Sequence, residues 1–403
     1  MLNWADRFNI FCLLDNQDYS IHPHRYECLL AAGSLQTISS DNLKDIDRFL
    51  SNNKQWTFGH LSYGLKNAIH KLSSEKQDKI GFPSFFFFVP EFLLQINGDQ
   101  LLIEGENCEK IYNEIVQQDN KLPLLSTLTL QQKLSKELYI EKIKRLQQHI
   151  VKGDCYEINF CQEFFAEDAS IDAVDIFQKL IGVSPNPFSA LYKLNDRYLI
   201  CASPERFIAK KGSKIFSQPM KGTSKRNLQN KEEDDRLKKE LQQSAKERSE
   251  NVMVVDMVRN DLSKICTESS VKVDELFGVY TYPQVHQMIS TISGEIKPEI
   301  KFSEIIGATF PMGSMTGAPK YRVMELIDEY ELSARGIFSG SVGYISPGGD
   351  FDFNVVIRSI MYNASKKYLS YQLGSGITFY SDPEKEWEEC LLKGEAIKKV
   401  LTS

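Results

Sequence analysis

The sequence lacks the features that would indicate a metal ribbon, a membrane protein or a nucleic-acid binder. Its eight cysteines are scattered and include no Cys-x-x-Cys pair, which argues against a zinc ribbon or thioredoxin-type site and fits a reducing cytosol. The longest apolar run, Phe85 to Pro90, is far shorter than the ~20 residues that span a bilayer. No signal-peptide core follows Met1. The net charge is −6 and no long basic stripe occurs, so a nucleic-acid partner is not expected. These absences predict a cytoplasmic protein.

The composition is that of an ordinary globular protein. The chain has 403 residues, of which 42% are hydrophobic and 25% charged. A chain of this length buries a sizeable core without disulfides or metal staples. Length alone fits either one large unit or two to three domains.

Hydrophobic patterning predicts short strands with helices between them. Residues 1 to about 125 mix strand-like runs with polar turns, and a connector is expected at about 119–130. Beyond it we expect helices over 136–152, 231–262 and 384–401, a strand over 155–165, and hairpins formed by 198–208 with 213–218 and by 340–346 with 352–362. Hairpins with separate helices favour an α+β fold built on antiparallel sheets.

Two pairs of glutamates stand at helical spacing. Glu247 and Glu250 are three residues apart in a predicted helix and share one face, and Glu386 and Glu389 repeat this spacing. For an isolated pair, a solvated helix face is the commoner interpretation. If the two pairs converge, the carboxylates repel one another unless a cation lies between them, and hard oxygen ligands suit Mg²⁺.

Several motifs occur in the order of one family's signatures. They are 203–205 (Ser-Pro-Glu), 219–223 (Pro-Met-Lys-Gly-Thr), 246–251 (Lys-Glu-Arg-Ser-Glu-Asn), 254–262, 310–320 and 381–389. Together they resemble the chorismate-utilising enzymes, the anthranilate synthase component I family. The lysine at 221 resembles the Pro-Ile-Lys-Gly-Thr signature of the aminodeoxychorismate synthase component I branch, whereas anthranilate synthases usually have alanine there. The resemblance implies a two-subdomain α/β sandwich of packed antiparallel sheets with outer helices. Residues 1–125 would form its N-terminal part and 130–403 the chorismate-binding catalytic region.

The same resemblance assigns roles to individual residues. It implies that Lys221 attacks chorismate, that Glu205 is the general acid and that His286 lies near the leaving hydroxyl. The alternatives are a solvated lysine, a surface glutamate after a proline and a structural histidine. Glu250 and Glu389 would bind Mg²⁺, flanked by Glu247 and Glu386. Substrate contacts would come from Gly222, Thr223, Ser314, Tyr344, Arg358, Gly374, Ser375, Gly376 and Lys393.

The implied activity is Mg²⁺-dependent amination of chorismate at C4 to 4-amino-4-deoxychorismate, in para-aminobenzoate and folate biosynthesis. Because no Gly-x-Cys-x-Gly glutaminase motif is present, the ammonia would come from a separate glutamine amidotransferase subunit, in a heterodimer, or from external ammonium. Two alternatives stay open: anthranilate synthase component I, and a non-catalytic chorismate-binding or regulatory protein.

One position departs from the family pattern. Residues 154–162 resemble the family's Gly-Asp-x-Tyr-Gln-Val-Asn strand, but Glu157 stands where glutamine is usual. The isochorismate and salicylate branches have a water-activating lysine there. Glu157 therefore argues against those branches, although a carboxylate is itself able to act as a base.

Overall fold

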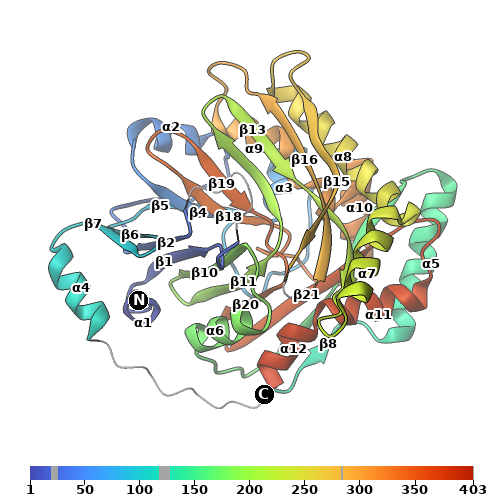
Figure 1. Ribbon diagram of the computed structural model, residues 1–403, viewed down its shortest axis with the longest axis horizontal. Coiled ribbons are helices and arrows are strands. Elements are labelled where there is room, and N and C mark those ends of the chain that lie inside the picture. The colour runs from blue at the N-terminus through green and yellow to red at the C-terminus, as the bar shows by residue number, and fades with distance from the viewer. Residues whose placement is uncertain (20–25, 118–127, 283–284, 403) are drawn as a thin grey trace.

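The protein is a sandwich of two antiparallel sheets with helices on the outside (Figure 1). The computed structural model describes residues 1–19, 26–117, 128–282 and 285–402. Every strand pair within them is antiparallel, as in the pairing of β21 with β9. The expected α+β sandwich is confirmed.

The first sheet contains eleven of the described strands. In spatial order they are β17 (Gly317–Ala318), β9 (Glu157–Ala166), β21 (Tyr368–Ile377), β20 (Ser359–Asn363), β11 (Arg197–Ser203), β10 (Phe188–Leu194), β1 (Ile10–Asp15), β2 (Cys28–Ala32), β6 (Phe92–Asn97) and β7 (Gln100–Glu104), with β8 (Gln131–Gln132) beside β9.

The second sheet contains ten described strands. Their order is β14 (Met220–Lys225), β16 (Val285–Glu295), β13 (Lys214–Gln218), β12 (Arg206–Lys211), β19 (Phe351–Asn354), β18 (Ser341–Ile345), β4 (Thr57–Leu61), β5 (Phe85–Val89) and β3 (Gln36–Ile38), with β15 (Lys272–Thr281) beside β16. Strands from the first 104 residues therefore complete both sheets. The connector expected at 119–130 lies mostly outside the described residues.

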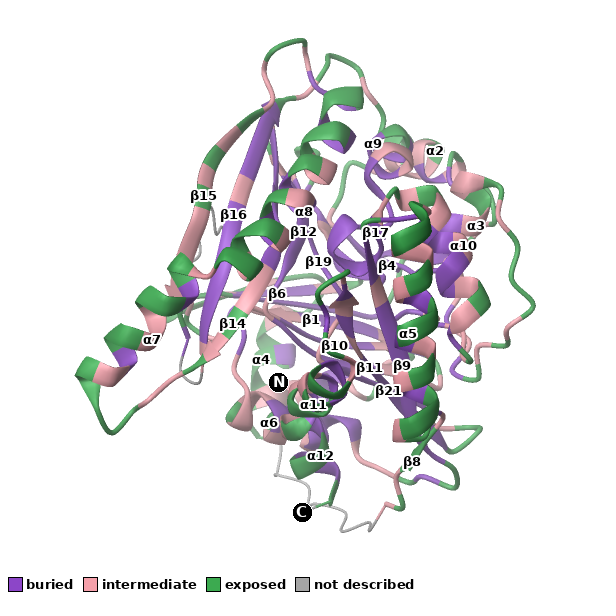
Figure 2. Cartoon of the chain, turned by 90° about the vertical axis from the view of Figure 1, so that its right-hand side faces the viewer, coloured by how far each residue is buried: buried purple, intermediate pink, exposed green. Residues whose placement is uncertain are grey.

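The helices surround the sandwich, and their outward faces are exposed (Figure 2). They are α1 (Leu2–Ala5), α2 (Asp45–Asn52), α3 (Leu65–His70), α4 (Cys108–Val116), α5 (Lys136–Lys152), α6 (Ala173–Val183), α7 (Lys231–Gln243), α8 (Ala245–Ile265), α9 (Phe302–Thr309), α10 (Lys320–Tyr330), α11 (Pro383–Lys393), α12 (Glu395–Thr402) and the short 3₁₀ helix η1 (Gly313–Met315). Among the described helices, none combines the length and apolar composition that a membrane span needs.

The apolar run that begins at Phe85 forms a strand buried on both faces. The ring of Phe88 lies 6.2 Å from that of Phe58, whereas the ring of Phe87 lies 6.0 Å from that of Phe302 on α9. Successive side chains of a strand point to opposite faces. A continuous apolar sequence, instead of an alternating one, therefore fits a strand with the core on one side and a helix on the other. The predicted buried strand is confirmed.

Two of the predicted helices are each divided in two. Ser244 ends α7 and caps α8, its hydroxyl accepting a hydrogen bond from the Glu247 amide at 3.3 Å. Gly394 separates α11 from α12. The predicted helix over 136–152 is confirmed as α5, with Ser135 at its N-cap and Gly153 in the left-handed conformation at its C-cap.

The predicted hairpins are wrong in one respect: the chain changes sheets within them. Strand β11 belongs to the first sheet and β12 to the second, so the chain crosses at Pro204 and Glu205. It crosses back between β19 and β20, over residues 355–358. The two crossings lie side by side, since β11 pairs with β20 and β12 pairs with β19. The amide of Val355 also donates to the carbonyl of Glu205 at 3.0 Å.

A buried ion pair fixes the end of η1 to strand β9. Arg335 and Glu331 have side chains 1% and 3% exposed and form a two-pronged contact at 2.6 and 2.9 Å. The same guanidinium donates to the carbonyls of Met315 at 2.6 Å and Asn159 at 2.9 Å. The pair therefore positions two segments that line the cavity described below.

We expect Glu331→Ala to lower the free energy of unfolding by about 3–5 kcal/mol, because it leaves a buried guanidinium without its counter-charge. Urea denaturation measures this. The matched control is Glu325→Ala on the same side of the fold, where the pair with Arg322 at 3.0 Å is more than a third exposed and the expected change is below about 1 kcal/mol. Equal, small effects for both variants would show that the buried pair does not hold this region together.

Candidate active site

A cavity of about 510 Å³ opens between the ends of the two sheets and helices α8 and α11. Most residues that the sequence singled out line it: Glu205, Lys221, Gly222, Thr223, Glu247, Glu250, Ser314, Arg358, Gly374, Gly376, Glu386, Glu389 and Lys393. They come from both sheets and from both flanking helices, over nearly two hundred residues of sequence. The fold thus gathers side chains that are distant along the chain.

Lys221 reaches the cavity from a bulge in β14. The pairing of β14 with β16 shifts by one residue between Met220 and Thr223, and such a bulge re-aims a side chain. The Lys221 ammonium donates to the carboxylate of Glu157, on β9 of the other sheet. Burial works to lower the pKa of Lys221, but the carboxylates of Glu157 and Glu250 outweigh it and raise the pKa above its ordinary value. In this arrangement the lysine is charged.

Glu205 occupies the first crossing between the sheets. Its side chain is buried, with the residue 4% exposed, and its backbone is held by Ser203 and by the Val355 amide. Burial raises the pKa of Glu205 to about 7, against the opposing effects of the nearby Ser314 hydroxyl and the Lys221 ammonium. A carboxyl group with such a pKa is poised to donate a proton near neutral pH.

Arg358 occupies the second crossing. Its φ of 52° lies in the left-handed region, where a non-glycine residue is strained and where such strain collects at functional sites. Among the described residues, no hydrogen bond or ion pair engages its guanidinium. Burial lowers the pKa of Arg358, opposed by Glu389, without bringing an arginine near neutrality. A partly buried, uncommitted guanidinium in a cavity is suited to a ligand carboxylate.

Two glycines of β21 make room at the cavity wall. A side chain at Gly376 would place its Cβ 2.6 Å from Glu157 Oε1 and 2.7 Å from Lys221 Nζ. At Gly374 a Cβ would lie 2.3 Å from the carbonyl oxygen of Phe160. Gly222 has a φ of 83° and faces Glu247. Small residues are therefore required where the backbone approaches the reactive side chains.

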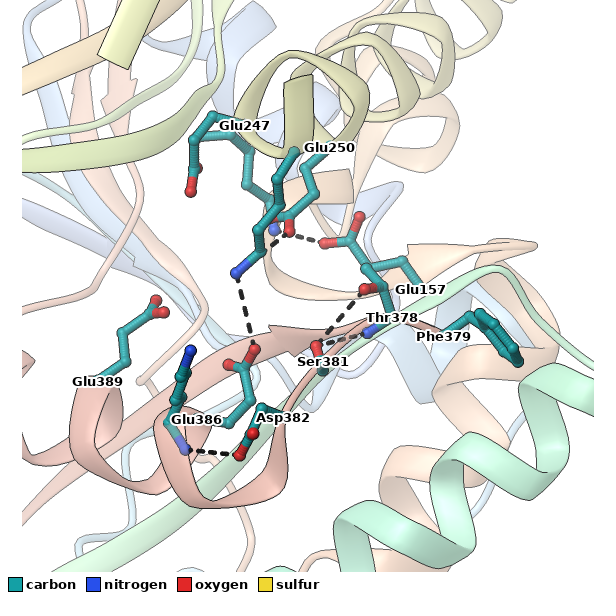
Figure 3. Close-up of polar contacts among 12 residues, drawn as sticks. Glu157, Glu247, Glu250, Thr378, Phe379, Ser381, Asp382, Glu386 and Glu389 are labelled. Carbon is teal, nitrogen blue, oxygen red and sulfur yellow. Dashed lines mark hydrogen bonds and ion pairs between the residues drawn. The ribbon is translucent and has the colours of Figure 1, made fainter. Parts of the chain in front are cut away.

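The two glutamate pairs face each other across the cavity (Figure 3). Glu247 and Glu250 lie on α8, and Glu386 and Glu389 lie on α11. Lys246 Nζ lies 3.9 Å from both Glu250 and Glu386, and Lys393 Nζ lies 2.8 Å from Glu389. All four carboxylates line the cavity, with lysine ammonium groups beside them.

The carboxylates differ in their electrostatics. Burial raises the pKa of Glu250 to about 7 and also raises the pKa of Glu247. For Glu389 burial acts in the same direction, but Lys393 and Lys246 outweigh it and lower the pKa. Two carboxyl groups on α8 therefore stand in surroundings that disfavour their charge.

The donor set fits a divalent cation. No three His, Cys, Asp or Glu side chains of the described ranges are gathered closely enough to hold a metal as they stand. Yet Glu250 Oε1 is buried and accepts no hydrogen bond from a described residue, and carboxylate oxygens are what Mg²⁺ prefers. A bound cation would offset the cost of burying this oxygen, which accepts no hydrogen bond from a described residue and has only the Lys246 ammonium at 3.9 Å.

Three predicted residues lie outside the cavity lining. His286 is buried, with its ring nitrogens 3.1 Å from Asp234 and from Thr281. Tyr344 contacts the aromatic rings of Tyr26 and Trp56. Ser375 points to the opposite face of β21 from its glycine neighbours, because side chains alternate along a strand.

Other lining residues were not singled out from the sequence. They include Asn159, Gln287, Met315, Phe338 and Gln372. Gln287 donates to the Gly222 carbonyl at 2.6 Å and accepts from Thr223 at 2.8 Å, so it supports the bulge that carries Lys221. Strand periodicity was the available signal, because neighbouring side chains on β16 point to opposite faces: Gln287 faces the cavity, and the buried His286 faces away from it.

Comparisons with known proteins agree on a single family. The family model described as chorismate binding enzyme matches residues 12–399. An aminodeoxychorismate synthase component 1 from Escherichia coli is 37% identical over 348 residues, 85% of this chain and 76% of its own length. An anthranilate synthase component I-like protein from Synechocystis is 31% identical over 366 residues, 89% of this chain and 75% of its own length.

Solved structures show the same fold. Anthranilate synthase component I from Streptococcus pneumoniae superposes with a TM-score of 0.82 at 23% identity, covering 94% of this chain and 93% of its own. A menaquinone-specific isochorismate synthase from Escherichia coli gives 0.79 at 17% identity, covering 99% and 91%. With its sandwich, its cavity and a family match over nearly the whole sequence, the chain belongs to the chorismate-binding enzymes.

Proposed function

We propose that the protein aminates chorismate at C4 to give 4-amino-4-deoxychorismate, as component I of an aminodeoxychorismate synthase in para-aminobenzoate and folate biosynthesis. The observation that carries this proposal is Lys221, which projects into the cavity from a bulge and contacts Glu157. A relative 37% identical to the chain is named for this activity.

Arg358 accounts for recognition of the substrate. Chorismate carries two carboxylates, and the guanidinium offers a planar pair of donors that no described side chain engages. Gly374 and Gly376 line the same cavity as Arg358. Thr223 and Ser314 add hydroxyl groups at the cavity wall.

Lys221 and Glu205 account for the chemistry. The amine of Lys221 attacks C2, the two ring double bonds shift, and the C4 hydroxyl leaves as water after taking a proton from Glu205. Ammonia then adds at C4, the double bonds shift back, and the C2–N bond to the lysine breaks. A buried carboxyl group with a pKa of about 7 is protonated often enough at neutral pH to serve as that acid.

Glu250 and Glu389, flanked by Glu247 and Glu386, would hold Mg²⁺. The ion supplies positive charge against these carboxylates and a substrate carboxylate. Ammonia would come from a glutamine amidotransferase subunit, since a relative carries the name component 1.

A product assay tests the proposal. With chorismate, Mg²⁺ and high ammonium at mildly alkaline pH, wild-type protein is expected to form aminodeoxychorismate, and Lys221→Ala to form it at least ~10³-fold more slowly. Liquid chromatography with mass detection separates the products. Anthranilate and pyruvate from the wild type would instead assign the chain to the anthranilate synthase branch, for which other relatives are named.

The pH dependence of hydroxyl loss tests Glu205. The acid form of a group with a pKa of about 7 is present below that pH, so the single-turnover rate is expected to fall by about tenfold per pH unit well above it. Glu205→Gln, which cannot donate this proton, is expected to lower the rate by ~10²–10⁴-fold and to remove the decline. A decline that persists in the variant would assign the titration to another group.

The Mg²⁺ requirement tests the acidic pairs. We expect Glu250→Gln to raise the Mg²⁺ concentration for half-maximal activity by about tenfold or more, because one charged oxygen ligand is replaced by a neutral amide. A titration of activity against Mg²⁺ measures this, and Glu240→Gln, on the exposed face of α7, is the control. Unchanged Mg²⁺ dependence in Glu250→Gln would remove this glutamate from the ligand set.

A further inference from the structure

We propose that Glu157 is the proton acceptor for Lys221: it takes a proton from the ammonium group before the amine attacks, and returns it when the amine leaves. The inference rests on the proposed function, in which Lys221 is the nucleophile. It assigns a catalytic role to the one position of the β9 motif at which this chain departs from the glutamine usual in the family.

The geometry places one oxygen of Glu157 on the lysine and leaves the other uncommitted. The side chains of Glu157 and Lys221 are 3% and 11% exposed, and Nζ donates to Oε1. The second oxygen, Oε2, is buried and accepts no hydrogen bond from any residue in the described ranges. Gly376 packs against both groups, since a Cβ there would lie within 2.7 Å of Nζ. The pair is therefore confined and shielded from water.

The surroundings create the need for a local base. The carboxylates that act on Lys221, besides Glu157, are Glu205 from the sheet crossing, Glu247 and Glu250 from α8, and Glu389 from α11. The charged groups Lys246, Arg358, Glu386 and Lys393 line the same cavity. Burial works to lower the pKa of Lys221, but the carboxylates around it, Glu157 first and then Glu250, outweigh burial and raise the pKa. An ammonium ion has no lone pair, so the nucleophile forms only after a proton leaves.

Among the carboxylates around Lys221, Glu157 is best suited to accept that proton. It is the carboxylate whose hydrogen bond to Nζ the structure shows. Glu205 must be protonated to serve as the acid, and Glu250 belongs to the proposed cation site. The glutamine usual at this position has an amide oxygen, which is not a base near neutral pH.

The proton balance closes over one turnover. The ammonium gives H⁺ to Glu157, which leaves a neutral amine and a neutral carboxyl group. The amine lone pair forms the C2–N bond while the C4–O bond breaks with a proton from Glu205, and the proton released on forming the secondary amine restores the acid form of Glu205. When ammonia adds at C4 and the C2–N bond breaks, the leaving nitrogen takes the proton held by Glu157, and the proton lost by the new amino group restores the Lys221 ammonium.

Adduct formation in the absence of ammonia isolates this step. Intact-protein mass spectrometry after rapid quenching measures the gain of one chorismate less one water, at saturating Mg²⁺, between about pH 6 and 7. Glu157→Gln is expected to form the adduct ~10²-fold more slowly than wild type at pH 6. The ratio of wild-type to variant rates is expected to fall about tenfold per pH unit, because the variant depends on free amine supplied by solvent. Taking the ratio cancels the titration of Glu205, which both proteins share.

Two further variants separate proton acceptance from structure. Glu157→Asp retains a carboxylate and is expected to recover part of the rate. Glu163→Gln removes another buried carboxylate from the same face of β9, where it contacts Ser333 and Tyr368 outside the cavity, and is expected to keep the wild-type rate. Thermal melting of each variant confirms folding.

The adduct measurements separate the role of Glu157 from the covalent role of Lys221. Adduct in the wild type with a slow, pH-dependent Glu157→Gln supports the inference. Adduct in both at equal rates, or a rate ratio independent of pH, overturns it while the proposed function stands. No adduct in the wild type overturns the covalent function and the inference together.

Discussion

The hydrogen bond between Lys221 and Glu157 joins the two sheets beside the cavity. Each residue is contributed by a different sheet, Lys221 by β14 and Glu157 by β9, so the pair forms only when the sandwich is assembled. An ammonium and several carboxylates enclosed together stabilise one another, whereas any one of them left alone would be costly to bury. The raised pKa values of Glu205 and Glu250 share this cause, because both carboxyl groups are buried in the same cavity.

The two sheet crossings place two further side chains at the cavity wall. Glu205 and Arg358 lie at the two points where the chain passes from one sheet to the other, and neighbouring strand pairs hold those points side by side. A residue at a crossing lies outside the hydrogen-bonded strand pairs, so its side chain does not follow the alternation between the two faces of a sheet. Such a position is able to strain the backbone, as the left-handed φ of Arg358 shows. The Arg335–Glu331 pair fixes the adjacent η1 segment to β9. The two sheet crossings therefore contribute two side chains to the candidate active site.

Much of this was accessible from the sequence, for identifiable reasons. Local signals predicted α5 with both caps and the buried strand β5, and motif order predicted the sandwich and the gathering of Lys221, Glu205, Arg358 and the acidic pairs. Periodicity did not reveal the sheet crossings, because a strand that continues into another sheet keeps the same alternation of apolar and polar residues. It did not reveal the break between α7 and α8 at Ser244, because capping residues also occur inside helices. His286 and Tyr344 were selected by motif position, whereas their placement outside the cavity depends on which face of β16 and β18 each occupies. The importance of Glu157 was visible as a departure, but its contact with Lys221 joins residues 64 positions apart that no local pattern connects.

If Lys221 is the nucleophile, it forms a covalent bond to chorismate. Peptide mapping by tandem mass spectrometry, on wild-type protein incubated with chorismate and Mg²⁺ without ammonia and then quenched, locates any adduct to a residue. We expect a single modification, on Lys221, that disappears when ammonium is added before quenching. Modification of another residue, or efficient formation of aminodeoxychorismate with an unmodified Lys221 at every quench time, would contradict it.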